Sequence, residues 1–364
     1  MSERPIRLGA VGVGDVAHRD YLPEIGRLGS DAEVVAVAGA REERAQEVAE
    51  RLGARWYVGY RALLEKNEVD AVLDLTPPRL HEEVNRAALE AGQHVYSEKP
   101  VASTAAEARS LADLAEARGL VLAAAPSVLV FPQVRLVRGI LASGGLGRVV
   151  AASGSAFGGV PPWEGYTSDP SFYFAEDVGP LVDVGVYPLH ALTGLLGPAR
   201  RASATARRTR DRFEVLDGPA RGAIVPIDVE DLWQLTLELD DGIVAAVHAS
   251  FASAASSGPE LEILGDQGAV ACSLLDPAAP VRVDEGDGWK DLTVDAERTA
   301  GPDHVLGVRH FVGSILGEEE PVLGAGHAAH VLDVIEAARR SSAGGRAVEV
   351  PDHGWSPPTR TTEP

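Results

Sequence analysis

The feature that most constrains the fold is a glycine-rich turn near the N-terminus. The run GVGDVA at positions 12–17 matches the pattern G-x-G-x-x-A and directly follows the apolar segment 6–13. Glycines allow a tight turn and let backbone N–H groups approach a pyrophosphate, and the N-terminus of the next helix favours an anion. A purely structural glycine turn is the alternative interpretation. The pattern predicts that the following residues lie at a dinucleotide: Gly12, Gly14, Asp15, Val16 and Ala17.

Apolar runs alternate with longer amphipathic segments through the first 124 residues. Continuous apolar runs are typical of strands buried on both faces, and the alternation predicts a parallel sheet with right-handed helical crossovers. We predict strands at 6–13, 33–38, 69–75, 94–96 and 121–124, and helices at 16–28, 42–52, 80–91 and 104–118.

After residue 124 the pattern changes to longer strands and fewer helices. We predict strands at 149–157, 231–239, 243–251, 260–264 and 269–274, helices at 180–196 and 327–341, and a long loop at 206–228. The predicted fold class is α/β. A Rossmann dinucleotide-binding domain spans 1–124, and an α+β domain with a mainly antiparallel open sheet spans 125–350 and serves substrate binding and oligomerisation. Residues 351–364 form a tail, which we expect to be poorly ordered from Asp352 onward.

Composition excludes several classes of protein. Lys and Arg number 33 against 54 Asp and Glu, a net charge of −21, so we expect no nucleic-acid and no membrane partner, both of which require clustered positive charge. The single cysteine, Cys272, excludes a disulfide framework, and no cluster of ligands predicts a metal. No apolar segment has the length of a signal peptide core or a membrane span, so we expect a cytoplasmic protein.

The end of the second predicted strand bears on the choice of cofactor. An acidic residue normally stands there and binds the ribose 2′-hydroxyl of NAD. This chain has Gly39-Ala40-Arg41 instead. Gly39 leaves space and Arg41 supplies charge for a 2′-phosphate, which favours NADP, although NAD remains an alternative. Arg41 could equally be a solvated residue at the start of a helix.

Three further motifs carry a family resemblance. TPPRLH at 76–81, AGQHVYSEKP at 91–100 and GPLVDVGVY at 179–187 resemble motifs of the glucose-fructose oxidoreductase/inositol dehydrogenase (Gfo/Idh/MocA) family of NAD(P)-dependent oxidoreductases. Pro78 stands where the family usually has Asn, and Gln93 replaces a common Lys, which we expect to be a surface change. The resemblance covers roughly residues 5–350. It implies further cofactor contacts from Thr76, Pro77, His81, Glu98 and Lys99.

The resemblance also implies the catalytic residues Lys99, Asp183 and Tyr187. An ammonium at the exit of a parallel strand can polarise the reacting oxygen of an alcohol or ketone, and a cis bond before Pro100 is implied. Asp183 and Tyr187 are four residues apart, which predicts one helix face, and they inherit substrate binding and proton transfer. Either Lys99 or Tyr187 can carry the proton. The alternatives are a lysine at a surface loop, a helix-start charge at 183 and a core tyrosine at 187.

For the other candidate substrate-binding residues, the sequence allows either contact with the substrate or a role in packing. His190 occupies a position that can touch a sugar hydroxyl, although one helical histidine is more often structural. Trp163 and Tyr166, with Tyr173 nearby, can stack on a sugar face or pack against each other.

The sequence therefore predicts a dehydrogenase or reductase acting on CH–OH groups. Hydride would pass between a nicotinamide cofactor and a secondary alcohol or ketone of a sugar or polyol-like substrate. An NAD-dependent glycoside-cleaving enzyme of the same family and a non-enzymatic NADP-binding sensor are the alternatives. The alternating strands of the second domain, together with the resemblance, predict a homodimer or homotetramer.

Overall fold

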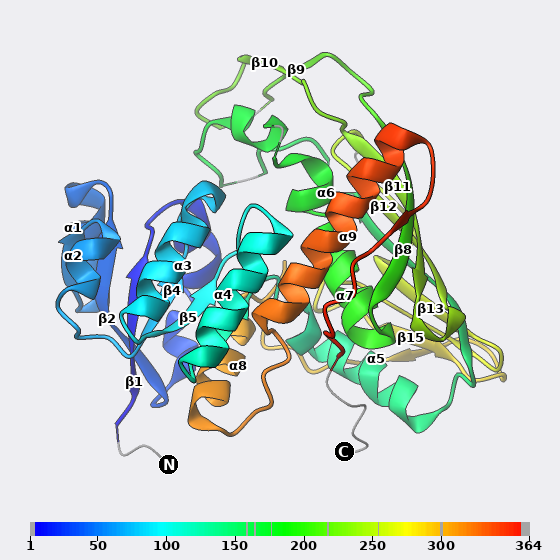
Figure 1. Ribbon diagram of the computed structural model, residues 1–364, viewed down its shortest axis with the longest axis horizontal. Coiled ribbons are helices and arrows are strands. Elements are labelled where there is room, and N and C mark those ends of the chain that lie inside the picture. The colour runs from blue at the N-terminus through cyan, green and yellow to red at the C-terminus, as the bar shows by residue number, and fades with distance from the viewer. Residues whose placement is uncertain are drawn as a thin grey trace. The chain divides into compact units, whose positions relative to one another are not determined.

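The computed structural model describes residues 4–157, 159–163, 165–175, 177–216, 218–253, 255–298 and 301–357. Contacts divide the chain into two compact units, each with its own large sheet (Figure 1). The first unit consists of Met1–Ser127 with His304–Ala329, and the second consists of Val128–Asp303 with His330–Pro364. No helix in the described part of the chain has the length and apolar character needed to cross a bilayer.

The first unit contains a parallel sheet in the order β3-β2-β1-β4-β5-β6. The bounds are β1 (Ile6–Val11), β2 (Ala32–Gly39), β3 (Arg55–Val58), β4 (Ala71–Asp74), β5 (His94–Ser97) and β6 (Leu122–Ala124). The connecting helices are α1 (Glu42–Leu52), α2 (Tyr60–Leu64), α3 (His81–Glu90) and α4 (Ala105–Ala117). This is the predicted Rossmann arrangement. The strand order changes direction between β1 and β4, the point where such sheets bind ligands at their carboxyl ends.

The predicted helix 16–28 is not continuous. A π-helical turn spans Ala17–Tyr21, and a 3-10 turn spans Ile25–Leu28. Pro23 lies between them and lacks the N–H that a continuing helix needs.

The first unit also takes a segment from the C-terminal half, unlike the predicted boundary at 124. This segment contains α8 (Val305–Leu316), and α9 (Ala325–Gly344) begins in it and ends in the second unit. The ring of Phe311 lies 5.9 Å from that of Tyr96 on β5. A Cβ at Gly307 would lie 2.4 Å from the Tyr96 hydroxyl, so α8 packs closely against this strand.

The second unit contains a mixed sheet in the order β16-β15-β14-β13-β7-β12-β11-β8-β17. The bounds are β7 (Val149–Phe157), β8 (Ala199–Arg207), β11 (Leu232–Leu239), β12 (Val244–Ser250), β13 (Leu261–Gly265), β14 (Ala269–Cys272), β15 (Val281–Asp284), β16 (Lys290–Leu292) and β17 (Val348–Glu349). Its pairs are antiparallel except β7 with β12, which confirms the mainly antiparallel prediction. The helices α5 (Pro132–Ser143), α6 (Gly179–Asp183) and α7 (Val186–Leu196) contact this sheet.

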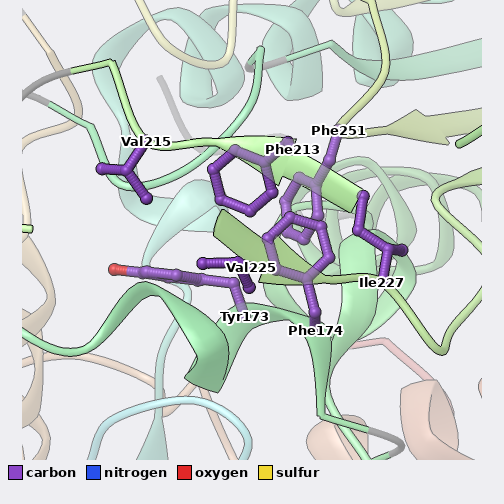
Figure 2. Packing of buried hydrophobic residues seen from close by; sticks show 7 residues of the cluster. All are labelled: Tyr173, Phe174, Phe213, Val215, Val225, Ile227 and Phe251. Atoms are coloured by element: carbon purple, nitrogen blue, oxygen red, sulfur yellow. The ribbon is translucent and has the colours of Figure 1, made fainter. Parts of the chain in front are cut away.

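Two predictions for the second unit are wrong. The segment 206–228 is not only a loop, because β9 (Arg212–Glu214) and β10 (Ile224–Pro226) form a hairpin in it. Apolar side chains around this hairpin form a separate buried cluster (Figure 2). The cluster consists of Tyr173, Phe174, Phe213, Val215, Val225, Ile227 and Phe251.

The second wrong prediction is the tail. Asp352 forms an ion pair with Arg200, and the Trp355 ring stacks on that of His330 with centroids 5.2 Å apart. The start of the tail is therefore held against the second unit, while residues 358–364 lie outside the described residues.

Candidate functional site

The glycine turn has the geometry that close approach of a diphosphate requires. Gly12 has φ +97°, and its N–H donates to the Ala38 carbonyl at 2.9 Å. A Cβ at Gly12 would lie 2.5 Å from the Leu75 carbonyl carbon and oxygen, so only glycine fits. Gly14 is exposed, and a Cβ there would meet nothing within 4 Å. The backbone at Gly14 is therefore open to a ligand, as the pyrophosphate of a dinucleotide needs.

Positive charge lies beside this turn. The His18 N–H donates to the Gly14 carbonyl at 3.1 Å. Burial lowers the pKa of His18, and Arg51 and Arg44 on α1 lower it further. Arg41 is exposed at the N-cap of α1. The basic side chains of Arg51 and Arg44 thus lie near His18, together with the carboxylates of Glu47 and Asp15, which act to raise its pKa.

Gly39 lies at the end of β2, where an acidic residue would stand in an NAD-binding site. A Cβ at this position would lie 2.7 Å from Cγ2 of Val13. A larger residue at 39 therefore requires Val13 to move.

A buried polar network follows β4. The Asp74 Oδ1 accepts from the Thr76 N–H at 3.0 Å and from its hydroxyl at 2.6 Å. His81 is 0% exposed, with Nε2 2.7 Å from the Thr76 carbonyl oxygen and Nδ1 2.6 Å from the Pro100 carbonyl oxygen. Both ring nitrogens are therefore engaged by the protein's own backbone. The prediction that His81 contacts the cofactor is corrected: it lies behind the turn that Thr76 and Pro77 form.

Lys99 lies two residues after the end of β5 and is half-buried. The bond to Pro100 is cis, as the resemblance implies. The backbone N–H of Lys99 donates to Glu98 Oε2 at 2.9 Å, and Glu98 Oε1 accepts from the Tyr21 hydroxyl. Glu98 is only 6% exposed. We therefore replace its predicted cofactor contact with a role in holding the Lys99 backbone.

Tyr21 was not among the predicted site residues. Burial raises its pKa well above the ordinary value, with Glu98 raising it further, so the hydroxyl remains a donor. The Tyr96 hydroxyl lies 3.4 Å from that of Tyr21 and 2.8 Å from Oγ of Ser127. Tyr96 lies in the motif at 91–100 that resembles the family, which was the signal available in the sequence.

Gln93 is buried, not on the surface as predicted. It is 2% exposed, and its amide atoms have no hydrogen-bond partner among the described residues. The chain turns inward between α3 and β5, and the sequence alone carries no sign of this.

In the second unit, Asp183 and Tyr187 lie on two helices instead of one. Asp183 ends α6 and Tyr187 lies in the first turn of α7, and both are half-buried. The Gly185 N–H donates to the Pro180 carbonyl at 2.8 Å, and a Cβ at 185 would lie 2.7 Å from the Leu181 carbonyl oxygen. Val184 and Gly185 thus form a turn between two helices, so the prediction of one continuous helix over 180–196 is wrong.

The remaining predicted substrate residues make packing contacts. His190 is 5% exposed, and burial together with His330 lowers its pKa to about 3. The Trp163 ring lies 6.1 Å from Tyr166 and 5.3 Å from Tyr173, both edge-on. Trp163 and Tyr166 pack against the cluster drawn in Figure 2. For these residues the geometry favours the packing alternative.

Together, the parallel sheet, the glycine turn and the basic residues beside it define a dinucleotide-binding α/β protein. Comparison with models of protein families then identifies the family within this class. Residues 6–125 match the model for the oxidoreductase family with an NAD-binding Rossmann fold, and residues 134–271 match the GFO/IDH/MocA C-terminal domain. The chain belongs to the Gfo/Idh/MocA family.

Individual relatives agree with this assignment. The chain is 38% identical over 206 residues to dTDP-3,4-didehydro-2,6-dideoxy-alpha-D-glucose 3-reductase of Streptomyces violaceoruber, covering 56% of this chain and 58% of that protein. It is 27% identical to D-xylose 1-dehydrogenase (NADP(+)) 2 of Haloferax volcanii, covering 94% and 99%. The chain thus aligns with little more than half the length of the first of these relatives.

A solved structure with a cofactor is also similar. KijD10, a 3-ketoreductase from Actinomadura kijaniata in complex with TDP-benzene and NADP, is 28% identical, with a TM-score of 0.72 and coverage of 93% of this chain and 98% of that chain.

Proposed function

We propose that the protein is an NADP-dependent oxidoreductase acting on a secondary alcohol or ketone of a sugar or polyol-like substrate. The observation that carries this proposal is the open glycine turn after β1, together with Lys99 two residues after β5 of the same parallel sheet. The named relatives, a reductase of a dTDP-linked sugar and a D-xylose dehydrogenase, support the substrate class.

The proposed reaction uses Lys99, Asp183 and Tyr187. In the oxidation direction a C–H bond of the substrate is broken, and nicotinamide, when bound, supplies the acceptor for the hydride. Lys99 donates a hydrogen bond to the reacting oxygen and polarises it. The hydroxyl proton leaves to the Tyr187 phenolate while the Lys99 ammonium donates, or to Lys99 itself as a neutral amine, and Asp183 orients the substrate. In the reduction direction the same groups return the proton to the oxygen.

Thr76, Pro77 and the glycine turn would hold the cofactor. The small Gly39, the exposed Arg41 and the basic residues around His18 support NADP over NAD.

The first experiment is a thermal-shift titration with NADP⁺ and NAD⁺, followed by a panel of sugars and polyols monitored at the nicotinamide absorbance. We expect Lys99→Met to bind NADP⁺ normally and to lose about 100-fold or more in kcat. The matched control is Lys290→Met, because Lys290 is an exposed lysine of the second unit. Turnover near the wild-type level in Lys99→Met would overturn the assignment.

The same experiment separates the alternatives. Cofactor that survives purification, with cleavage of an aryl glycoside and no net nicotinamide reduction, would indicate the glycoside-cleaving reaction. Tight NADP⁺ binding without turnover of any panel member would indicate the sensor.

We also propose a cytoplasmic homodimer or homotetramer formed through the open sheet. On the face away from α7, Val244 and Leu264 flank Ala151 in register, and they are 45% and 37% exposed. Apolar side chains in one row on an uncovered sheet face favour association. Light scattering after gel filtration tests this, and a monomer at micromolar concentration would contradict it.

A further inference from the structure

The ring of His81 faces two acceptors. The Thr76 and Pro100 carbonyl oxygens lie 2.7 and 2.6 Å from its two ring nitrogens. A carbonyl oxygen can only accept, and a neutral imidazole carries one N–H. In either neutral tautomer, one ring lone pair would therefore point at a carbonyl oxygen within hydrogen-bond distance. Only the doubly protonated ring satisfies both contacts.

Other buried histidines show a different pattern. His310 Nε2 accepts from the Val322 N–H at 3.1 Å, and His330 Nε2 accepts from the Ala199 N–H at 3.0 Å. A nitrogen that accepts from a backbone N–H cannot carry a proton itself. These rings therefore have one unprotonated nitrogen, and burial of a histidine in this protein does not by itself produce two donors.

A buried imidazolium needs a compensating charge. Asp74 is fully buried at the end of β4, and burial raises its pKa above the ordinary value, although His81 and the two hydrogen bonds from Thr76 act to lower it. Glu98, two positions before Pro100, raises the pKa of Asp74 further. Asp74 is therefore the carboxylate on which His81 acts.

The two carbonyl groups that contact the His81 ring belong to turns that follow neighbouring strands. Thr76 belongs to the turn after β4, where the cofactor is proposed to bind, and Pro100 follows Lys99 after β5. We propose that His81 is a buried imidazolium that donates to both carbonyls, ties these two turns together and so positions Lys99. The positioning role rests on the proposed function, whereas the charge of the ring does not.

The charge is tested by NMR of the full-length protein labelled with ¹⁵N-histidine. We expect both ring nitrogens of His81 to be protonated at about pH 7.5, where a solvated ring is largely neutral. His310 is the internal control and should show one unprotonated nitrogen. His81→Gln and His310→Gln assign the signals. One unprotonated nitrogen at His81 at about pH 7 would overturn the proposal.

The positioning role is tested on the lysines, of which the chain has only three, Lys66, Lys99 and Lys290. In protein labelled with ¹³C-lysine, His81→Ala should shift the Lys99 signal and leave those of Lys66 and Lys290 unchanged. On the best substrate of the panel, kcat should fall about 100-fold while the KM for NADP⁺ changes little. His81→Gln, whose amide carries two N–H donors, should restore part of the loss.

An unchanged Lys99 signal with unchanged kcat in His81→Ala would contradict the positioning role. Should His81→Ala fail to fold, Asp74→Asn serves instead, because it keeps an acceptor for Thr76 and removes the charge. It should leave one His81 nitrogen unprotonated. Absence of turnover on every substrate would count against the proposed function alone, since both NMR measurements need no reaction.

Discussion

The backbone N–H of Lys99 donates a 2.9 Å hydrogen bond to the side-chain carboxylate of Glu98, the residue before it. The other oxygen of that carboxylate accepts from the Tyr21 hydroxyl. Two donors on opposite oxygens fix the carboxylate, and the carboxylate fixes the backbone that carries the proposed catalytic lysine.

Glu98→Gln should therefore weaken both stability and turnover. The amide keeps one acceptor oxygen but turns an NH₂ group toward one of the two donors. We expect the free energy of unfolding to fall by about 1–3 kcal/mol, measured by urea denaturation, and kcat to fall about tenfold or more. The exposed Glu90→Gln on α3 is the control. Wild-type stability and kcat in Glu98→Gln would show that the carboxylate has no such role.

The buried His190 and His330 predict that the second unit loses stability in mild acid. Burial lowers the pKa of His190 to about 3, with a smaller contribution from His330. Burial also lowers the pKa of His330 to about 4, with a smaller contribution from Arg200. In the unfolded chain both titrate near 6.5. Below that pH the unfolded state binds protons that the folded state does not, so the free energy of unfolding falls as the pH decreases.

At about pH 5 each ring should cost on the order of 2 kcal/mol relative to about pH 7.5. Urea unfolding at the two pH values measures this difference, and His190→Leu should remove about half of the contribution of the pair. Above about pH 7.5 the variant and the wild type should respond to pH alike. Equal pH dependence of both proteins in the acidic range would contradict the assignment.

Local signals made much of the first unit predictable. Continuous apolar runs marked its strands, and helical spacing placed the helix 42–52 at the bounds that α1 has. The antiparallel strands of the second unit could also be predicted from local signals. Along β11 and β12 buried and more exposed side chains alternate from one residue to the next, which the sequence shows as alternating apolar and polar or small residues.

Features that depend on distant contacts could not be predicted. The break at Gly185 arises from contact with the preceding turn, while apolar spacing continues through it. The TPPRLH motif identified His81, but its bond to Pro100 joins residues 19 apart in the sequence. The β9–β10 hairpin did carry a signal in its first strand, since Phe213 and Val215 alternate with polar residues.

Gly12 and Gly14 should respond differently to alanine. At Gly12 the positive φ and the 2.5 Å approach to Leu75 predict a loss of about 3 kcal/mol or more in unfolding free energy. At Gly14 the Cβ enters open space, so stability should change by less than about 1 kcal/mol.

The new methyl group at Gly14 would nevertheless occupy the space that a diphosphate needs. We expect NADP⁺ affinity to fall about tenfold or more, or about 1.4 kcal/mol, in a fluorescence titration. Unchanged affinity in Gly14→Ala would place the cofactor away from this turn.

Gly39 and Val13 should together determine the choice between NADP and NAD. We expect the wild type to bind NADP⁺ about tenfold or more tightly than NAD⁺ in calorimetric titrations. Gly39→Asp should reverse this preference, because a carboxylate binds the ribose 2′-hydroxyl and repels a 2′-phosphate.

Gly39→Asp should also destabilise the fold, since the Cβ of the aspartate would lie 2.7 Å from Val13 Cγ2. Val13→Ala alone is the control and should leave the preference unchanged. In the double variant the stability should recover while the NAD preference persists, a coupling that a double-mutant cycle measures. The same NADP⁺ to NAD⁺ affinity ratio in Gly39→Asp and in the wild type would show that this position does not read the 2′-group.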